Sequence, residues 1–268
     1  MVGVIKPSKE LLNVLKKWAG GNVKFEKYEN QLDVKLNRPD KHNSLSGTMM
    51  LELAEHSEKF TDPKISIIRI SGAGKSFCSG ADLGLIKDIS ENNLGIEMFE
   101  FMSKVLRRIS SSKAISIANI HGYAFGGATE ICSSANIRIA DAKSKIKFSQ
   151  SMMGIVPSWG GAEYLEEIMG RGRALSAMCR ANVMTAEEAE KLGWIDFVYK
   201  NEDEANKFLQ EFTSSGYKVV QAQKAMLNAV KKYEFEKQKH ILDGVWKGET
   251  HKNALNKQFE AIVKKSGN

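Results

Sequence analysis

The chain has 268 residues, a hydrophobic fraction of 42% and a formal net charge of +7. This length and this hydrophobic content fit one large α/β domain, or one domain with a small appendage, and exclude a largely disordered protein. Three widely spaced cysteines without a C-x-x-C pair argue against a disulfide framework or a zinc ribbon and favour a reducing compartment. We expect all three, Cys78, Cys132 and Cys179, to be core or near-core thiols.

The charge balance is basic, with a sequence pI near 9.1. Such a balance favours an anionic ligand, for example a cofactor that carries phosphate groups. The lysines are scattered, however, and no arginine-rich arm is present, so we expect a solvated basic surface and no nucleic-acid partner. Residues 1–21 contain no long apolar run, which predicts neither a signal peptide nor a membrane span and leaves the cytosol as the expected location.

The first elements are a helix and a hairpin. Residues 1–21 form a predicted N-terminal helical extension, in which Ser8 caps a short amphipathic helix that ends at two glycines. Period-two alternation in residues 23–25 and 32–36 predicts two strands around a turn. A second helix is expected to open at Asn43 or Ser44.

Strands and helices then alternate through the middle of the chain. The pattern predicts a buried strand over 65–70, a helix over 96–109, a strand over 115–117, a helix over about 127–134 and a strand over 137–139. This alternation predicts an α/β core over residues 22–200. Residues 201–268 are lysine-rich with a helical pattern and predict a separate α-helical region.

Three common kinds of site do not fit the sequence. The run Gly72-Ala73-Gly74-Lys75-Ser76 resembles a phosphate-binding loop, but Arg69 stands where such a loop needs its first glycine. The five histidines show no metal-ligand spacing. No G-x-S-x-G elbow of a serine hydrolase is present.

Two glycine-containing segments carry the chemistry. The first is S-F-C-S-G-A-D-L over residues 76–83, directly after a strand, and the second is H-G-Y-A-F-G-G-A-T-E over residues 121–130. Small residues let backbone N–H groups approach a ligand, and in the second segment these groups begin a helix whose dipole favours negative charge. Two such donors on one carbonyl oxygen would form an oxyanion hole. Taken singly, each segment is equally compatible with a tight turn.

Taken together, the two segments resemble the crotonase superfamily. The order of the motifs also matches, with L-N-R-P-D-K-H-N-S-L at 36–45 before them and G-I-V-P-S-W-G-G at 154–161 after them. The resemblance implies an α/β fold with a crotonase-like ββα spiral core and a C-terminal α-helical trimerisation region. It also implies an acyl-CoA substrate and a homotrimer or homohexamer.

The resemblance implies site residues as well. Ala81 and Gly127 would each supply an oxyanion N–H group, and Glu130 would orient a substrate carboxylate or manage a proton. The loop over 41–45, with Ser79 and Gly80, would border the CoA path, and Phe125, Met152 and Trp159 would shape the acyl pocket. The implied substrate-binding residues are Lys41, His42, Ser44, Leu45, Ser79, Gly80, Asp82, Leu83, Phe125, Gly126, Met152, Pro157 and Trp159.

One absence bears on the reaction. Hydratases of this superfamily use two glutamates, and the second should fall between Phe148 and Gly154, where this chain has S-Q-S-M-M. Addition of water needs both a base and a proton donor, so efficient hydration is not expected. The run from Met153 to Gly161 resembles an ethylmalonyl-CoA decarboxylase subgroup, although that subgroup has charged residues where this chain has Gln150-Ser151-Met152.

The predicted function is therefore an acyl-CoA lyase. It would decarboxylate ethylmalonyl-CoA or methylmalonyl-CoA through a thioester enolate, with no metal or biotin, because the oxyanion hole would serve as the electron sink. One alternative is an enoyl-CoA hydratase or isomerase that uses Glu130 as its single acid and base. A second alternative is a non-catalytic trimeric protein that binds a partner through its basic face.

Overall fold

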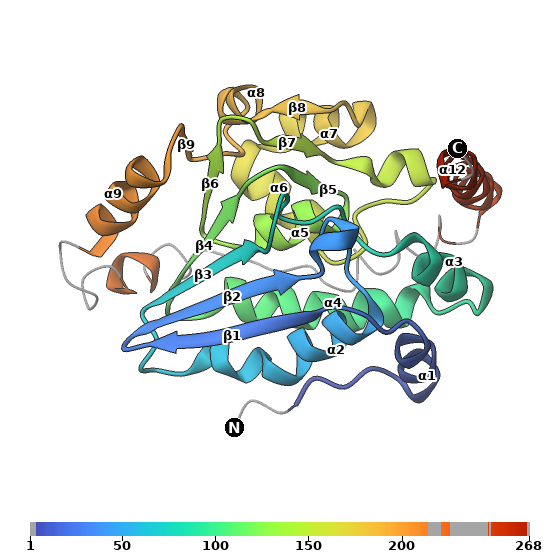
Figure 1. The fold of residues 1–268 in the computed structure, drawn as a ribbon, viewed down its shortest axis with the longest axis horizontal. Helices are drawn as coiled ribbons and strands as arrows, with labels where there is room; N and C mark the ends of the chain where they lie inside the picture. The colour runs from blue at the N-terminus through green and yellow to red at the C-terminus, as the bar shows by residue number, and fades with distance from the viewer. Residues whose placement is uncertain (1–3, 214–220, 226–245, 247, 267–268) are drawn as a thin grey trace.

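The computed structural model describes residues 4–213, 221–225, 246 and 248–266 (Figure 1). Within these residues, six strands form the main sheet in the spatial order β1-β2-β3-β4-β6-β9. β1 and β2 form an antiparallel hairpin in which Val23 pairs with Leu36, as the alternation predicts, and the remaining pairs are parallel. The strands are β1 Asn22–Tyr28, β2 Gln31–Asn37, β3 Ile67–Gly72, β4 Ile115–Ile120, β6 Ile137–Asp141 and β9 Phe197–Tyr199.

A smaller sheet carries one side of the candidate site. Its described strands are β5 Tyr123–Phe125, β7 Lys145–Lys147 and β8 Met184–Thr185, with β7 between the other two. The short helix η3 Ser149–Met153 follows β7 directly.

Helices cover the sheets and complete the core. α2 and α4 run along the hairpin side, and α5 and α6 lie between the two sheets (Figure 1). The helices of the core are α1 Lys9–Lys17, α2 Gly47–Glu55, α3 Leu83–Glu91, α4 Gly95–Ser110, α5 Gly127–Ser134, α6 Gly161–Met169, α7 Arg171–Arg180 and α8 Ala186–Lys191. The described helices α9 Glu202–Thr213 and α12 Glu249–Ser266 belong to the predicted C-terminal helical region. The parts of that region at 214–220 and 226–245 lie outside the described residues.

The N-terminal helix packs into the same core as the rest. Ser8 caps α1 as predicted by accepting a hydrogen bond of 3.1 Å from the Leu11 N–H, and Leu11 and Leu15 are fully buried. α2 packs against α1 so closely that a Cβ atom at Gly47 would lie 1.9 Å from the Leu15 carbonyl oxygen. Glycine is therefore required at the start of α2, because any side chain there would displace α1.

The predicted start of α2 was wrong by several residues. The helix begins at Gly47, and Ser46 is its cap, with its Oγ accepting from the Met49 N–H at 3.2 Å. Asn43 instead shapes the loop before the helix: it is buried with a φ of 55°, and its Oδ1 accepts a hydrogen bond of 2.7 Å from the Arg38 N–H. An asparagine tolerates this left-handed conformation, so the signal for a helix cap was in fact a signal for a turn.

Two further expectations can be compared with the structure. Cys78 and Cys132 are buried thiols as predicted, but Cys179 is exposed on α7, which corrects the expectation that all three lie in or near the core. Among the described residues, no helix has both the length and the apolar character to cross a lipid bilayer.

Candidate active site

Two loops meet at the carboxyl ends of β3 and β4. The Cys78 N–H donates to the Tyr123 carbonyl at 2.9 Å, and the Phe125 N–H donates to the Cys78 carbonyl at 3.1 Å. These two bonds fix the relative position of the loops. Cys78 pairs with Ala124 across the two loops. Ala81 lies three residues after Cys78, and Gly127 lies three residues after Ala124, so the two residues occupy matching positions along their loops.

The loops also come into close contact where these residues lie. A Cβ atom at Gly80 would lie 2.9 Å from the Phe125 carbonyl oxygen and 3.7 Å from the Gly127 nitrogen. Gly80 has a φ of +104°, which favours glycine for a second, independent reason. The backbone on both sides of Gly80 therefore runs beside the start of α5.

The N–H groups of Ala81 and Gly127 are available to a ligand. In the described part of the chain, neither group donates a hydrogen bond to another residue. Gly126 caps α5 with φ 54° and ψ −120°, and its own N–H donates to the Lys147 carbonyl at 2.9 Å. Gly127 is thus the first helical residue, where an N–H group has no partner within the helix and where the dipole favours negative charge.

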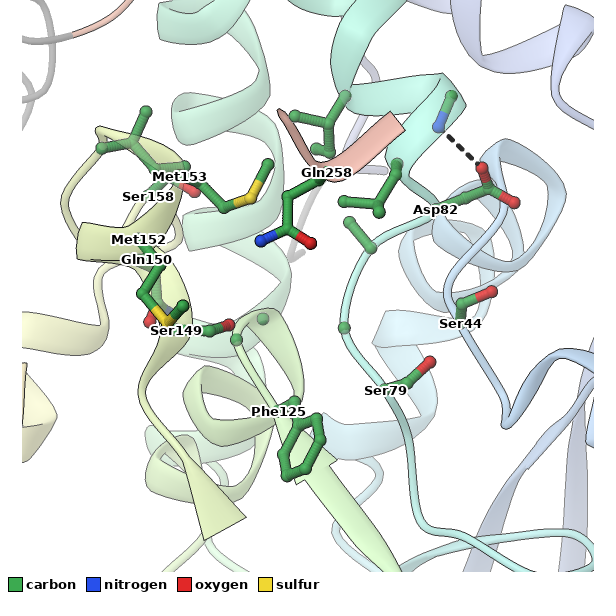
Figure 2. Close-up of a pocket in the computed structure, with 18 of the residues that line it drawn as sticks. Ser44, Ser79, Asp82, Phe125, Ser149, Gln150, Met152, Met153, Ser158 and Gln258 are labelled. Atoms are coloured by element: carbon green, nitrogen blue, oxygen red, sulfur yellow. Dashed lines mark hydrogen bonds between the residues drawn. The ribbon is translucent and has the colours of Figure 1, made fainter. Parts of the chain in front are cut away.

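Both residues line a cavity of about 630 Å³, which Figure 2 shows between the two loops. The sequence-predicted residues on its lining are Lys41, Ser44, Ser79, Gly80, Ala81, Asp82, Leu83, Phe125, Gly126, Gly127, Glu130, Met152 and Trp159. Residues from four separate parts of the chain therefore line one cavity.

Three predicted residues do not line this cavity. Leu45 is fully buried, and only its backbone is close to the site, through its pairing with Ala81. His42 is turned to Ser76, whose Oγ lies 3.0 Å from its Nδ1. Pro157 is absent from the lining residues as well. For Leu45 the cause is the apolar side chain, which packs into the core while the adjacent loop residues face the cavity.

Glu130 lies at the inner wall with 1% of its surface exposed. Its Oε1 accepts hydrogen bonds from Gln150 Nε2 and the Ser158 N–H, both at 3.1 Å. Its Oε2 accepts from the N–H groups of Trp159 at 2.7 Å and Gly161 at 2.9 Å. Burial raises the pKa of the Glu130 carboxyl, and the four hydrogen bonds oppose that rise. A role in proton transfer would require one of these bonds to be exchanged.

Asp82 is the other carboxylate on the described lining. Its Oδ1 accepts from the Gly84 N–H at 3.0 Å and caps α3, and its Oδ2 accepts from Arg38 Nη1 at 2.8 Å. Arg38 and Asp82 both have mostly buried side chains, so this ion pair fixes the loop. Asp82 therefore has a structural role that the sequence did not reveal.

Sequence reasoning missed about half of the lining. Gln150 stands in the segment where the sequence showed only the absence of an acid, and its Oε1 is buried without a hydrogen-bond partner among the described residues. No sequence signal could assign α12 to the site, because its position depends on tertiary packing. The lining residues that were not predicted are Trp18, Gly84, Ile86, Lys147, Ser149, Gln150, Met153, Ile155, Ser158, Gln258, Phe259 and Ile262.

A metal ion has no evident site in the part of the chain that the structure describes. No group of three or more His, Cys, Asp or Glu side chains is positioned there to hold one. The lining instead offers backbone N–H groups, serine hydroxyls, two carboxamides and two lysines beside apolar surface. This arrangement can bind an anionic thioester and stabilise negative charge on its carbonyl oxygen.

Comparison with known proteins gives a consistent result. The family model described as enoyl-CoA hydratase/isomerase matches residues 26–265. The chain is 32% identical over 270 residues to an ethylmalonyl-CoA decarboxylase of Rattus norvegicus, covering 96% of this chain and 87% of that protein. It is 34% identical over 258 residues to one of Gallus gallus, covering 91% of this chain and 86% of that protein.

Solved structures have the same fold. An enoyl-CoA hydratase from Bacillus halodurans superposes with a TM-score of 0.79 at 23% identity, covering 87% of this chain and 98% of that one. An enoyl-CoA hydratase from Thermoplasma volcanium superposes with a TM-score of 0.69 at 28% identity, covering 88% and 96%. The predicted crotonase-like fold is thereby confirmed.

Proposed function

Because the chain belongs to the enoyl-CoA hydratase/isomerase family, we propose that it decarboxylates a short 2-carboxyacyl-CoA such as ethylmalonyl-CoA or methylmalonyl-CoA. The observation that carries this proposal is the state of the carboxylates in the cavity. Both Asp82 and Glu130 are held by hydrogen bonds, and the described lining contains no other acid. Addition of water needs a carboxylate that is free to activate it, whereas decarboxylation needs no such base.

The proposed reaction uses the free N–H groups of Ala81 and Gly127. They bind the thioester oxygen, and the bond between C2 and the carboxylate carbon breaks. The electron pair of that bond moves into the enolate, CO₂ leaves, and C2 takes up one proton that comes ultimately from water. Donors of this kind contribute about 3–4 kcal/mol each, because they are already oriented toward the oxygen on which charge develops.

The other parts of the proposal follow from the lining. Lys41 is exposed in the loop before α2 and lines the cavity, which supports the proposal that it binds a CoA phosphate. Phe125, Met152 and Trp159 form the apolar surface around the acyl group. Assembly into a homotrimer or a pair of trimers is part of the same proposal, and the exposed apolar side chains of Leu175 and Val183 support an interface near α7.

The test is incubation of the purified protein with ethylmalonyl-CoA, methylmalonyl-CoA and crotonyl-CoA, each followed by mass spectrometry. We expect the first two to lose the mass of CO₂ and crotonyl-CoA to remain unchanged. In deuterated water the decarboxylated product should carry deuterium at C2. Hydration of crotonyl-CoA without loss of CO₂ from the other two would overturn the proposal.

An enoyl-CoA hydratase or isomerase is the second candidate, and the description of the matching family model favours it. An isomerase needs a single group that moves a proton between two carbons. Glu130 would be that group, so its side chain would have to release one of its four donors on substrate binding. Double-bond migration in a 3-enoyl-CoA, measured beside the decarboxylation assay, distinguishes the two candidates.

A further inference from the structure

α12 lines one side of the cavity and brings one polar side chain to it. Its contributions to the lining are Gln258, Phe259 and Ile262. Figure 2 shows the carboxamide of Gln258 between the Ser149–Met153 side and the side that carries Ser79 and Asp82. Gln258 is partly buried, and its carboxamide makes no hydrogen bond within the described residues.

The placement of Gln258 is set by contacts along the same helix. His251, at the start of α12, is fully buried, and its Nδ1 lies 2.6 Å from the Met153 carbonyl oxygen of η3. Leu255 is 3% exposed, and the ring of Phe259 lies 5.3 Å from Lys87 Nζ of α3. Residues three or four positions apart share one face of a helix, so these anchors and Gln258 face the core together. The carboxamide is thus held over the cavity from both of its sides.

A neutral hydrogen-bond donor suits the substrate carboxylate of a decarboxylation better than a cation does. A lysine paired with the substrate carboxylate would stabilise the anion in the ground state, and that stabilisation would be lost as the carboxylate becomes CO₂. A carboxamide N–H orients a carboxylate oxygen through one hydrogen bond without a full opposing charge. Orientation matters because the breaking bond must stand perpendicular to the thioester plane for its electrons to enter the enolate.

We propose that Gln258 binds the free carboxylate of the 2-carboxyacyl-CoA and sets it out of the thioester plane while Ala81 and Gly127 hold the thioester oxygen. Gln258 is then the residue that selects 2-carboxyacyl thioesters over plain acyl thioesters. This inference rests on the proposed decarboxylation. Lys41 and Lys147 are the cations on the described lining, and neither of them binds the substrate carboxylate in this arrangement.

The decisive variants are Gln258→Met, which keeps the size and removes the hydrogen-bonding groups, and Gln258→Glu, which adds a like charge. Asn253→Leu, on an exposed position of α12 away from the cavity, is the matched control. We expect Gln258→Met to lower kcat/KM for ethylmalonyl-CoA by about 10- to 100-fold, the range for a hydrogen bond to a charged group. Its Kd for butyryl-CoA, which lacks the carboxylate, should stay at the wild-type value, as should both quantities in the control.

The pH dependence of turnover in Gln258→Glu distinguishes carboxylate binding from a merely structural role of this residue. We expect a larger loss of kcat/KM relative to the wild type at neutral pH and a smaller one, relative to the wild type at the same pH, toward pH 5, as the new carboxyl becomes protonated and can donate a hydrogen bond. Wild-type kcat/KM in Gln258→Met, or an equal loss of butyryl-CoA binding, would overturn the inference. So would a carboxylate-specific loss in Lys147→Met together with normal turnover in Gln258→Met.

The proposed decarboxylation fails in a different way from this inference. If the wild-type protein binds butyryl-CoA but releases no CO₂ from any 2-carboxyacyl-CoA, the proposed function is wrong, and the role of Gln258 is wrong with it. If the wild-type protein decarboxylates ethylmalonyl-CoA and the Gln258 variants do so equally well, only the role of Gln258 is wrong.

Discussion

Glu130 Oε2 accepts a hydrogen bond of 2.7 Å from the backbone N–H of Trp159, which is 29 residues away in the chain. This bond ties the first turn of α5 to the turn that precedes α6. The indole of Trp159 in turn packs on Gly127, where a Cβ atom would lie 2.5 Å from the ring carbons Cη2 and Cζ3. The carboxylate of Glu130 therefore helps to set the wall behind the candidate oxyanion donor.

Replacing Glu130 by Gln should destabilise the protein as well as reduce its turnover. Each carboxylate oxygen accepts hydrogen bonds from two donors. The NH₂ group of the new glutamine would face two N–H groups from which it cannot accept a hydrogen bond. Donors left buried without an acceptor cost about 1–3 kcal/mol each, and we expect a loss of roughly 2–4 kcal/mol of unfolding free energy. Chemical denaturation and the CO₂-release assay measure the two effects.

Glu190→Gln is the control for this variant, because Glu190 is exposed on α8 and should tolerate the change in both assays. Lost turnover with wild-type stability in Glu130→Gln would contradict the structural role and assign Glu130 to proton transfer. Unchanged turnover would remove Glu130 from the reaction altogether.

Gly127→Ala should displace the candidate oxyanion donor. The new methyl group would overlap the Trp159 ring, so either the ring or the start of α5 must move. Overpacking of this kind costs about 1–3 kcal/mol of stability, and misplacement of an oxyanion donor costs about 100-fold or more in kcat. Steady-state kinetics and denaturation measure both quantities.

Gly172→Ala supplies the matched comparison, because nothing lies within 4 Å of the Cβ position of this helical glycine. It should raise stability by about 0.5–1 kcal/mol and leave kcat unchanged. Wild-type kcat in Gly127→Ala would show that the Gly127 N–H does not bind the thioester oxygen.

The sequence predicted most of the elements that carry backbone donors. Alternating apolar residues located the hairpin of β1 and β2, and the strand–glycine–helix pattern located α5 with Gly127 at its first position. These signals are local, since a two-residue or a 3.6-residue period is a property of one segment. The start of α2 was misplaced because Asn43 favours a turn as strongly as a helix cap.

The polar side of the cavity depends on contacts that no local pattern encodes. Gln258 enters it because His251 and Leu255 attach α12 to the core from a position more than a hundred residues beyond the candidate donors. The hydrogen bonds of Glu130 likewise follow from the meeting of α5 with a distant turn. The motif indicated that Glu130 matters, but not that its oxygens are already occupied.

Lys41→Ala should weaken binding of CoA thioesters without changing the chemical step. Lys41 is exposed at the edge of the cavity, and an exposed charge pair contributes about 0.2–1 kcal/mol, so KM for ethylmalonyl-CoA should rise by roughly two- to fivefold. An N-acetylcysteamine thioester, which has no phosphate, should show no change. Lys24→Ala, on an exposed position of β1, is the control, and an equal effect of both variants would contradict a local phosphate contact.

Acid pH should release α12 before the rest of the protein unfolds. Burial lowers the pKa of His251, while its bond to the Met153 carbonyl partly opposes this effect. Its Nε2 is buried and has no acceptor among the described residues, so a second proton there would be unpaired. The folded pKa therefore lies below the ordinary value of about 6.5.

The direction of the pH effect follows because the pKa of His251 is lower in the folded state than in the unfolded state. Above about pH 6.5 His251 is neutral in both states and its contribution to stability is complete, and this contribution is lost as the pH falls toward the folded pKa. Hydrogen exchange of residues 249–266 should accelerate over that range, and kcat/KM should fall with it.

His251→Gln keeps a donor for the Met153 carbonyl but does not titrate, so hydrogen exchange of α12 in this variant should depend less on pH. His121, whose pKa burial also lowers, contacts Gly74 and not α12, so His121→Gln should exchange like the wild type in this helix. A pH dependence in α12 that survives in His251→Gln and disappears in His121→Gln would contradict the assignment.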